Sequence, residues 1–384
     1  MNTTAETSPP TPLDGLRVVD LSTVIAGPTA ARYLGDFGAD VIKVEHPAGD
    51  AVRTMGWRDP SDDVTLWWKL IARNKRVVAL DLKDAGDLAS MRTLISHAEV
   101  LIENFRPGTL ERLGLEPADL LADNPSLVIT RVTGFGQDGP YAAKPGFATL
   151  AEAMSGFAAV NGEPDGAPLL PPIALADEIT GIVAAFATMV ALRSGAGQVV
   201  DVNLLDSMAQ MMGPVVANYL LNGDLPERLG SGIAYSVPRG TYLTADGEWI
   251  AISTSAPTVA ARVLELLGVG EDQRFITFEG RVAHRTELDE LLGGWVGRHT
   301  ASEVLATFDE IGAAAAPVLD AAGVAADPHM SSRGTVTELD GSPTHGLIAR
   351  LSATPGSLNW AGRPPDADGD AIRAALRDDE WPTG

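Results

Sequence analysis

The chain of 384 residues contains no cysteine. A disulfide, a catalytic thiolate and a metal or iron–sulfur site built on cysteine are therefore excluded. Basic residues are scarce as well: 28 Lys and Arg stand against 51 Asp and Glu, and the formal net charge is -23. A chain this acidic repels nucleic acid and anionic membrane surfaces unless a basic patch interrupts it, and none is visible. We expect neither nucleic acid nor membrane among its partners.

Other signals are missing too. The most apolar run, residues 179–192, is shorter than the roughly 20 residues of a membrane span and predicts a buried helix. The N-terminal residues MNTTAETSPPTP lack the basic and apolar regions of a signal peptide, so we expect a cytoplasmic location. The six histidines are scattered without the spacing of a metal site, and no G-x-S-x-G elbow occurs. We expect no metal.

Apolar runs alternate with helical stretches in the first half of the chain. Strands are predicted at RVVDLS, VIKVE, RVVALDL, VLIENF, LVITRVT and QVVDVNLL, with helices between most of them. This βαβ rhythm is typical of a parallel sheet covered by helices. A chain of this length fits one large domain and a smaller one.

The second half predicts a different organisation. One long helix is expected over residues 204–221, and GTYLTADGEWIAIST predicts a hairpin that opens a smaller domain. Near the end, GLIARLS predicts a strand that returns to the first sheet. We therefore expect a large domain at 1–200 and 330–384, a linker helix at 201–228 and a small domain at 229–329.

A literal G-x-G-x-x-G occurs at Gly134, Gly136 and Gly139 after a predicted strand. A dinucleotide loop should open a helix, but Pro140 follows directly and PYAAKPG cannot start one. These residues therefore predict a loop and not a dinucleotide site.

Asp177 stands where the apolar helix of PPIALADEITGIVAAFATMVAL begins. The ordinary role of an aspartate there is to cap the helix by accepting backbone N–H bonds. A functional role is compatible with that one, because the helix dipole keeps such a carboxylate ionised and an ionised carboxylate can attack a carbonyl. From the residues alone, both interpretations stay open.

An ordered set of segments resembles the signatures of the class III coenzyme A-transferases, a family that includes formyl-CoA transferase, carnitine CoA-transferase and α-methylacyl-CoA racemase. The segments are DGLRVVDLSTVIAGPTAARYLGDFGADVIKVEHP, NKRVVALDLK, ENFRPGTLERLG, GFGQDGPYAAKPGF, ALADEITG and GQVVDVNLLDSM. The resemblance runs from about Leu13 to DPHMSSRG, nearly the whole chain.

This resemblance implies an α/β fold with a Rossmann-like large domain, completed by the C-terminal segment, a small α/β domain and an interlocked homodimer. It implies a CoA-transferase that uses acyl-CoA and a small carboxylic acid and holds no tightly bound cofactor. Asp177 matches the family's catalytic aspartate, which forms a mixed anhydride and then an aspartyl-CoA thioester. Positions that hold coenzyme A in relatives are matched by Val24, His46, Leu80, Lys83, Asn104, Phe105 and Arg112.

Some positions depart from the family pattern. Ile25 and His46 stand where formyl-CoA transferase has glutamine and arginine, which speaks against an oxalate or formyl specialisation. Phe147 and Ala148 stand where racemases carry a His-Asp pair, and the last family motif is not recognisable in RPPDADGDAIRAALRDD. A racemase, isomerase or lyase on the same fold remains the alternative, and a non-catalytic CoA-binding protein is a third possibility.

Overall fold

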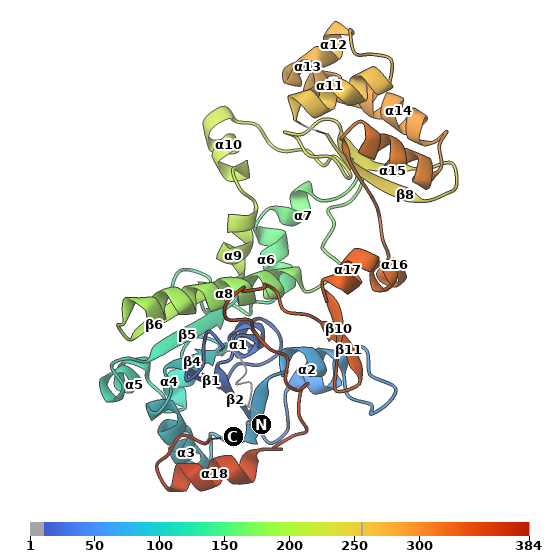
Figure 1. Cartoon of the computed structure of the whole chain (residues 1–384). Coiled ribbons are helices and arrows are strands. Elements are labelled where there is room, and N and C mark those ends of the chain that lie inside the picture. Colours follow the sequence, from blue (N-terminus) through green and yellow to red (C-terminus); the bar gives the residue numbers. More distant parts are fainter. Residues whose placement is uncertain (1–10, 255, 384) are drawn as a thin grey trace, which may run out of the picture. The chain divides into compact units, whose positions relative to one another are not determined.

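The computed structural model describes residues 11–254 and 256–383. The chain divides into two compact units (Figure 1). The first unit consists of Met1–Ser155, Pro171–Met212 and Pro328–Gly384, and the second of Gly156–Leu170 and Gly213–Asp327. The segment 156–170, which we had placed in the large domain, thus belongs to the second unit.

A six-stranded parallel sheet forms the centre of the first unit, in the order β3-β2-β1-β4-β5-β6. Its strands are β1 (Arg17–Asp20), β2 (Asp40–Glu45), β3 (Lys75–Ala79), β4 (Val100–Glu103), β5 (Val128–Thr133) and β6 (Gln198–Asn203). All six were predicted from the sequence. Helices cover both faces of the sheet, so most strands are buried and read as runs of Val, Ile and Leu.

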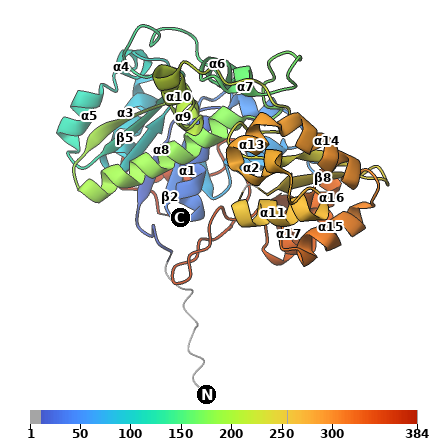
Figure 2. The same ribbon diagram turned by 90° about the horizontal axis from the view of Figure 1, so that it is seen from above.

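The helices of the first unit follow the expected alternation. They are α1 (Ala26–Asp36), η1 (Ala51–Thr54), α2 (Leu66–Ile71), α3 (Ala85–Ser96), α4 (Thr109–Arg112), α5 (Pro117–Asp123), α6 (Ala148–Met154), α8 (Leu175–Ser194), α9 (Leu204–Met211), α17 (Pro328–Ser332) and α18 (Gly369–Arg377). Helix α8 lies along α1, as Figure 2 shows. The two helices approach closely at Gly181, where an added Cβ would come within 2.5 Å of Thr29.

Helix α8 is less buried than the sequence predicts. Thr180, Ala184 and Thr188 are buried, but Phe186 and Val190 on another face are 69% and 55% exposed. By length and composition alone this helix could cross a membrane. The prediction of a buried helix is confirmed for the face of α8 that packs against α1 and is wrong for the opposite face.

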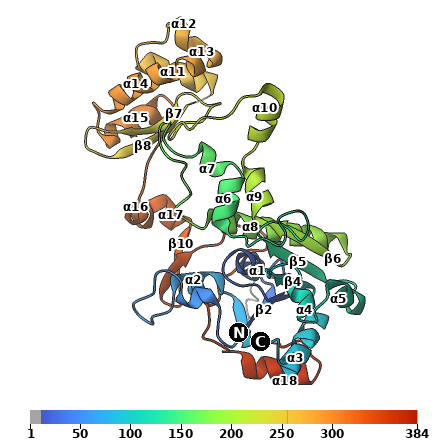
Figure 3. The ribbon, with the colours of Figure 1, turned by 180° about the vertical axis from the view of Figure 1, so that it is seen from behind.

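The C-terminal segment completes the first unit in an unexpected way. GLIARLS, residues 346–352, is not a strand, so that prediction was wrong. The outer edge of β3 is instead covered by Asp366 and Asp368, whose carboxylates each accept a backbone N–H of β3 at 2.8 Å. Helix α18 then packs on α3 (Figure 3) and contributes Ile372 to the core. Side-chain acceptors, and not a further strand, thus satisfy this edge of the sheet.

The second unit is a small α/β domain with its own core. A three-stranded antiparallel sheet is formed by β7 (Arg239–Leu243), β8 (Trp249–Ser253) and β9 (Ala314–Pro317). The predicted hairpin at Asp246 and Gly247 is confirmed. The remaining elements are α7 (Phe157–Val160), α10 (Val215–Asn222), α11 (Pro257–Leu266), α12 (Gln273–Ile276), α13 (Phe278–Ala283), α14 (Arg285–Val296), α15 (Ala301–Glu310) and α16 (Ala321–Ala326). A β10–β11 hairpin (Val336–Leu339 and Ser342–His345) belongs to the first unit.

The single linker helix expected over residues 204–221 is two helices, so this prediction was also wrong. Gly213 adopts a positive φ of 59° between α9 and α10, and Pro214 cannot donate the backbone hydrogen bond that a continuous helix requires. The boundary between the two units lies at this break.

Candidate active site

The order of the strands reverses between β1 and β4, which places the loops after these two strands beside each other. In open α/β sheets, ligands bind outside the carboxyl ends of the strands at such a switch point. The loop after β1, residues 21–25, and the loop after β4, which starts at Asn104, therefore mark the first place to look for a site.

The two loops are joined by the side chain of Asn104. Its Oδ1 accepts the backbone N–H of Thr23 at 2.7 Å, and its Nδ2 donates to the carbonyl oxygen of Thr23 at 2.6 Å. The next residue, Val24, has a φ of 67° and is 37% exposed. A left-handed conformation is costly for a β-branched residue, and strain of this kind gathers at functional sites.

Each residue expected to hold coenzyme A lies at the same edge of the sheet. His46 follows β2 directly, Leu80 follows β3, and Asn104 follows β4. The others come from the same loops or from the helix after β4: Val24, Lys83, Phe105 and Arg112. The structure thus brings the carboxyl-end positions of four adjacent strands to one edge.

These residues differ in what their side chains can offer. Leu80 is buried in the core and Phe105 packs against that core, so their side chains are largely structural. His46, Lys83 and Arg112 are exposed. Neither Lys83 nor Arg112 forms an ion pair with any residue in the described part of the chain, which leaves both cations available for a phosphate.

Asp177 is the third residue of α8 and does not cap it. The N-cap is Ala174, which has no side-chain capping bond. The capping role predicted for Asp177 was therefore wrong. Its carboxylate makes no hydrogen bond or ion pair with another described residue, and the residue is only partly exposed.

A second carboxylate, Glu152 of α6, takes the expected capping role. Its Oε1 accepts the backbone N–H of Ala176 at 3.2 Å, and the residue is 3% exposed. The sequence analysis missed Glu152, although an acid inside the apolar stretch ATLAEAM was a usable signal. No local pattern connects it with a helix that starts more than 20 residues later.

Burial raises the pKa of Asp177 to about 6, and the charges of Glu152 and Glu178 add to the rise. At pH 7 the carboxylate is still ionised in about nine molecules of ten. A partly desolvated carboxylate without partners, yet ionised at neutral pH, is suited to act as a nucleophile or a base. The helix dipole that we invoked for ionisation is outweighed here by burial.

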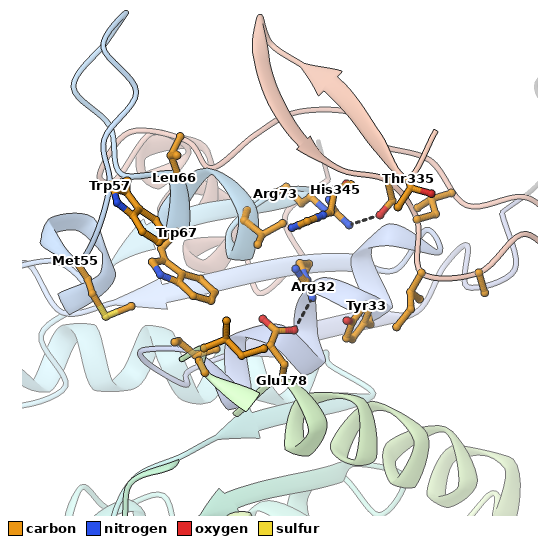
Figure 4. Close-up of a pocket in the computed structure, with 18 of the residues that line it drawn as sticks. Arg32, Tyr33, Met55, Trp57, Leu66, Trp67, Arg73, Glu178, Thr335 and His345 are labelled. Atoms are coloured by element: carbon orange, nitrogen blue, oxygen red, sulfur yellow. Dashed lines mark hydrogen bonds and ion pairs between the residues drawn. The ribbon is translucent and has the colours of Figure 1, made fainter. Parts of the chain in front are cut away.

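A pocket of about 1020 Å³ lies within the first unit at the start of α8. Ala174 and Glu178, on either side of Asp177 in the sequence, line this pocket, and Ile25 brings the β1–α1 loop to it. Figure 4 shows Trp57 and Trp67 on one side and Tyr33 on the other. The remaining lining residues are Arg32, Met55, Leu66, Leu70, Arg73, Pro171, Pro172, Ile173, Arg333, Thr335 and His345–Arg350.

The two buried arginines of this pocket are paired, whereas Arg333 and Arg350 are exposed and form no ion pair with another described residue. Arg32 lies 3.2 Å from Glu178, and Arg73 lies 2.5 Å from Asp36 (Figure 4 shows the first of these pairs). The Nε of Arg32 is buried without a hydrogen-bond partner. The pocket therefore offers an apolar, aromatic wall, the unpartnered Nε of Arg32 and the exposed guanidinium groups of Arg333 and Arg350.

The glycine segment after β5 forms a loop, as the sequence predicts. No helix starts between Gly134 and Phe147. Gly134 packs so tightly against Gly146 that a Cβ on either would lie 2.5 Å from the other's Cα. Among the described residues, no group of three or more His, Asp or Glu side chains is placed to hold a metal ion.

Comparison with known proteins identifies the family of this chain. Residues 13–370 match the model of the family described as CoA-transferase family III. A succinyl-CoA–D-citramalate CoA-transferase of Chloroflexus aurantiacus is 39% identical over 367 residues, which cover 92% of this chain and 91% of that protein. A succinate–glutarate CoA-transferase of Agrobacterium fabrum is 36% identical over 342 residues, covering 86% and 85%.

A solved structure shows the same architecture. The crystal structure of a CAIB/BAIF family protein from Brucella suis superposes with a TM-score of 0.85 at 35% sequence identity. The match covers 96% of this chain and 100% of that one.

Proposed function

Because this chain belongs to CoA-transferase family III, we propose that it moves coenzyme A between an acyl-CoA and a carboxylic acid through covalent intermediates at Asp177. The observation that carries the proposal is the environment of the Asp177 carboxylate and its ionisation at neutral pH. It is desolvated and free of partners, and its pKa of about 6 leaves it ionised at neutral pH. Its sequence neighbours Ala174 and Glu178 line the pocket that we propose for the acid.

The proposed reaction has four substitutions at carbonyl carbon. An Asp177 oxygen attacks the donor thioester, the C–S bond breaks, and coenzyme A leaves as a thiolate from a mixed anhydride. The thiolate then attacks the aspartyl carbonyl, which releases the donor acid and forms an aspartyl-CoA thioester. The acceptor carboxylate attacks this thioester to give a second anhydride. The thiolate finally attacks the acceptor's acyl carbon, which restores the Asp177 carboxylate.

This series of reactions exchanges one thioester for another, so it requires no nucleoside triphosphate. The protein's contribution is to supply an ionised but poorly solvated nucleophile and to keep water away from two anhydrides. The aromatic and aliphatic wall of the pocket, which includes Trp57, Trp67 and Ile173, is suited to exclude water.

We propose that the acids are small dicarboxylates. The relatives act, by their names, on succinyl-CoA with D-citramalate, L-malate or glutarate. Such acids carry a second carboxylate that must be neutralised when the first one reacts. Arg32 is a buried cation of the pocket whose Nε has no hydrogen-bond partner, so it could accept this carboxylate.

An oxygen-18 experiment tests the covalent mechanism. The enzyme is given succinyl-CoA and an acceptor acid labelled in both carboxylate oxygens. The mechanism predicts one labelled oxygen in Asp177 after the first turnover, visible as a gain of about 2 Da in its peptide. Later turnovers should raise the gain towards about 4 Da and release labelled succinate. Transfer without label in Asp177 would refute the aspartyl intermediates.

A second experiment separates transfer from α-proton exchange. A single-enantiomer 2-methylacyl-CoA in deuterated water should be neither racemised nor labelled, because Phe147 and Ala148 supply no ionisable partner. With a free acid present, hydroxylamine should trap an adduct at Asp177. Rapid deuterium uptake without an adduct would favour an isomerase, with Glu152 and Asp177 as the proton-transfer groups.

We also propose that the chain forms an interlocked homodimer. Helix α8 exposes Ile182, Phe186 and Val190 at intervals of four residues, which is one apolar stripe. None of the residues of α10 is buried, and Leu220 and Leu221 are 75% and 83% exposed. Apolar surfaces of this kind mark interaction sites, and a second copy of the chain is the partner proposed for them.

A further inference from the structure

Two buried lysines, one on β2 and one on β3, form ion pairs beside the loop after β1. Lys75 of β3 places its Nζ 2.8 Å from Oδ2 of Asp20, and both side chains are fully buried. Lys43 of β2 places its Nζ 3.3 Å from Oδ2 of Asp50, with side chains 2% and 1% exposed. The proposed reaction uses none of these four groups.

The second oxygen of each carboxylate faces the loop itself. Oδ1 of Asp20 accepts the backbone N–H of Ser22 at 3.1 Å, and Oδ1 of Asp50 accepts that of Val24 at 3.2 Å. The lysines reach the backbone directly as well. Lys43 donates to the carbonyl oxygen of Ser22, and Lys75 donates to that of Pro28 at 2.7 Å. The backbone on both sides of the strained residue Val24 is thus hydrogen-bonded to buried charged side chains.

Stability alone does not account for this arrangement. Replacing a buried ion pair by apolar side chains is often neutral or stabilising, so two such pairs beneath one loop are poor devices for holding a fold together. The left-handed backbone of Val24 is a further local cost. Both costs are concentrated at the loop after β1, one of the two loops at the switch point of the sheet.

We propose that Lys75 and Lys43 are positioning residues for coenzyme A, which act through Asp20 and Asp50 to hold the loop in the conformation that places Val24 against the ligand. This inference rests on the proposed binding of coenzyme A at that loop. Neither lysine touches the ligand. Their effect should therefore appear in the affinity for coenzyme A and in its dependence on pH.

The charge of Lys75 gives the proposal a pH signature. Burial lowers the pKa of Lys75 to about 8, against the opposing attraction of Asp20. The other charges that act on it are Lys43 of β2 and Arg32 of α1, which favour loss of its proton. Above about pH 8 the ammonium of Lys75 is lost, Asp20 keeps only the charge of Lys43 beside it, and the loop is held less firmly from this side.

Above about pH 8, the affinity for coenzyme A should fall as the pH rises, whereas the contribution of Lys75 to the free energy of unfolding should rise. Between about pH 8 and the ordinary pKa of 10.5, the folded protein binds fewer protons at Lys75 than the unfolded chain does. The contribution of this group to the free energy of unfolding therefore rises with pH. If the role of Lys75 were purely structural, the free energy of unfolding would show this gain but the affinity for coenzyme A would not fall.

The test compares Lys75→Met with Arg76→Met in the full-length protein. Arg76 is the next residue of β3, its side chain points to the opposite face, and it pairs with Asp40 at 2.6 Å. Binding of S-methyl coenzyme A, which has no titrating thiol, is measured by calorimetry from pH 7 to 9.5, with thermal unfolding in parallel. We expect Lys75→Met to weaken binding about tenfold at pH 7, which equals about 1.4 kcal/mol, and to abolish the pH step of the wild type.

The outcomes separate this inference from the proposed function. Equal binding by wild type and Lys75→Met, or equal weakening in Arg76→Met, would overturn the positioning role while leaving coenzyme A binding intact. A wild type that binds no coenzyme A analogue would instead remove the proposed function. If Lys75→Met does not fold, the wild-type profile decides: an affinity that stays constant from pH 7 to 9.5 overturns the inference.

Discussion

Asp177 is distinguished from other helix-terminal acids by what surrounds it. It occupies the third position of α8, as Asp119 does in α5. Asp119 is exposed, whereas Asp177 is partly buried beside Glu152 and has a raised pKa. The same residue type at the same helical position therefore has different chemistry, because only one of the two carboxylates is desolvated.

Asp177→Asn should abolish transfer while leaving coenzyme A binding within about twofold of the wild type. The amide has the same shape but cannot form an anhydride, and we expect a loss of at least about a thousandfold in kcat. Asp119→Asn is the matched control and should be fully active. A substantial residual rate in Asp177→Asn, after deamidation to Asp has been excluded by mass spectrometry, would end the nucleophile assignment.

The same variant should be more stable than the wild type at pH 7. A carboxyl whose folded-state pKa is raised destabilises the fold above that pKa, and the penalty disappears as the pH falls below its unfolded value. We expect a gain of about 1 to 2 kcal/mol at pH 7 and a smaller gain at pH 4. Denaturant unfolding at both pH values measures the difference.

Activity should fall on the acid side with an apparent pKa near 6. The protonated Asp177 carboxyl is not a nucleophile, so kcat/KM for the acyl-CoA should drop about tenfold per pH unit below that value. Glu152→Gln should shift this limb to lower pH, because it removes a negative charge but still accepts the N–H of Ala176. If Glu152→Gln leaves the apparent pKa of the acid limb unchanged, the carboxyl groups of Glu152 and Asp177 are not coupled.

At the scale of elements, the parallel strands gather the predicted ligand contacts at their carboxyl ends. Lys83→Ala and Arg112→Ala should each weaken coenzyme A binding at low salt, and the difference should shrink at high salt, where the Debye length falls from about 8 Å towards 3 Å. Arg193→Ala is a suitable control, since Arg193 lies in the last turn of α8, before the start of β6 and thus at the opposite edge of the sheet.

Calorimetric titration at two salt concentrations measures this effect. If neither Lys83→Ala nor Arg112→Ala changes the affinity at low salt, the phosphates of coenzyme A bind elsewhere on the chain. The exposed positions of both side chains make large effects on folding improbable in either variant.

For the whole molecule, an interlocked homodimer and a dimer of separable subunits differ in whether their subunits exchange. Differently tagged dimers should not exchange subunits when mixed, even after long incubation at nanomolar concentration, because separation would require unfolding. Exchange should occur only after denaturation and refolding of the mixture. Mass spectrometry of the native complexes reads out the mixed species, and a folded, fully active monomer on dilution would contradict the proposal.

The sequence by itself determined the six strands of the parallel sheet, the hairpin of the small domain and the position of Asp177 near the start of α8. These features depend on local chemistry: runs of Val and Ile that a buried strand requires, an Asp-Gly turn, and an apolar stretch long enough for a helix. The ordered set of family segments extended this to the enzyme class, which the comparisons confirm.

Only the tertiary structure decided which groups act on one another. Glu152 caps α8 in place of Asp177 and raises its pKa from another helix, Asp366 and Asp368 cover β3 across almost 300 residues, and the lysines under the β1–α1 loop come from β2 and β3. Local propensity cannot reveal such pairings, because burial and electrostatic coupling depend on distances in space that the fold creates between segments remote in sequence.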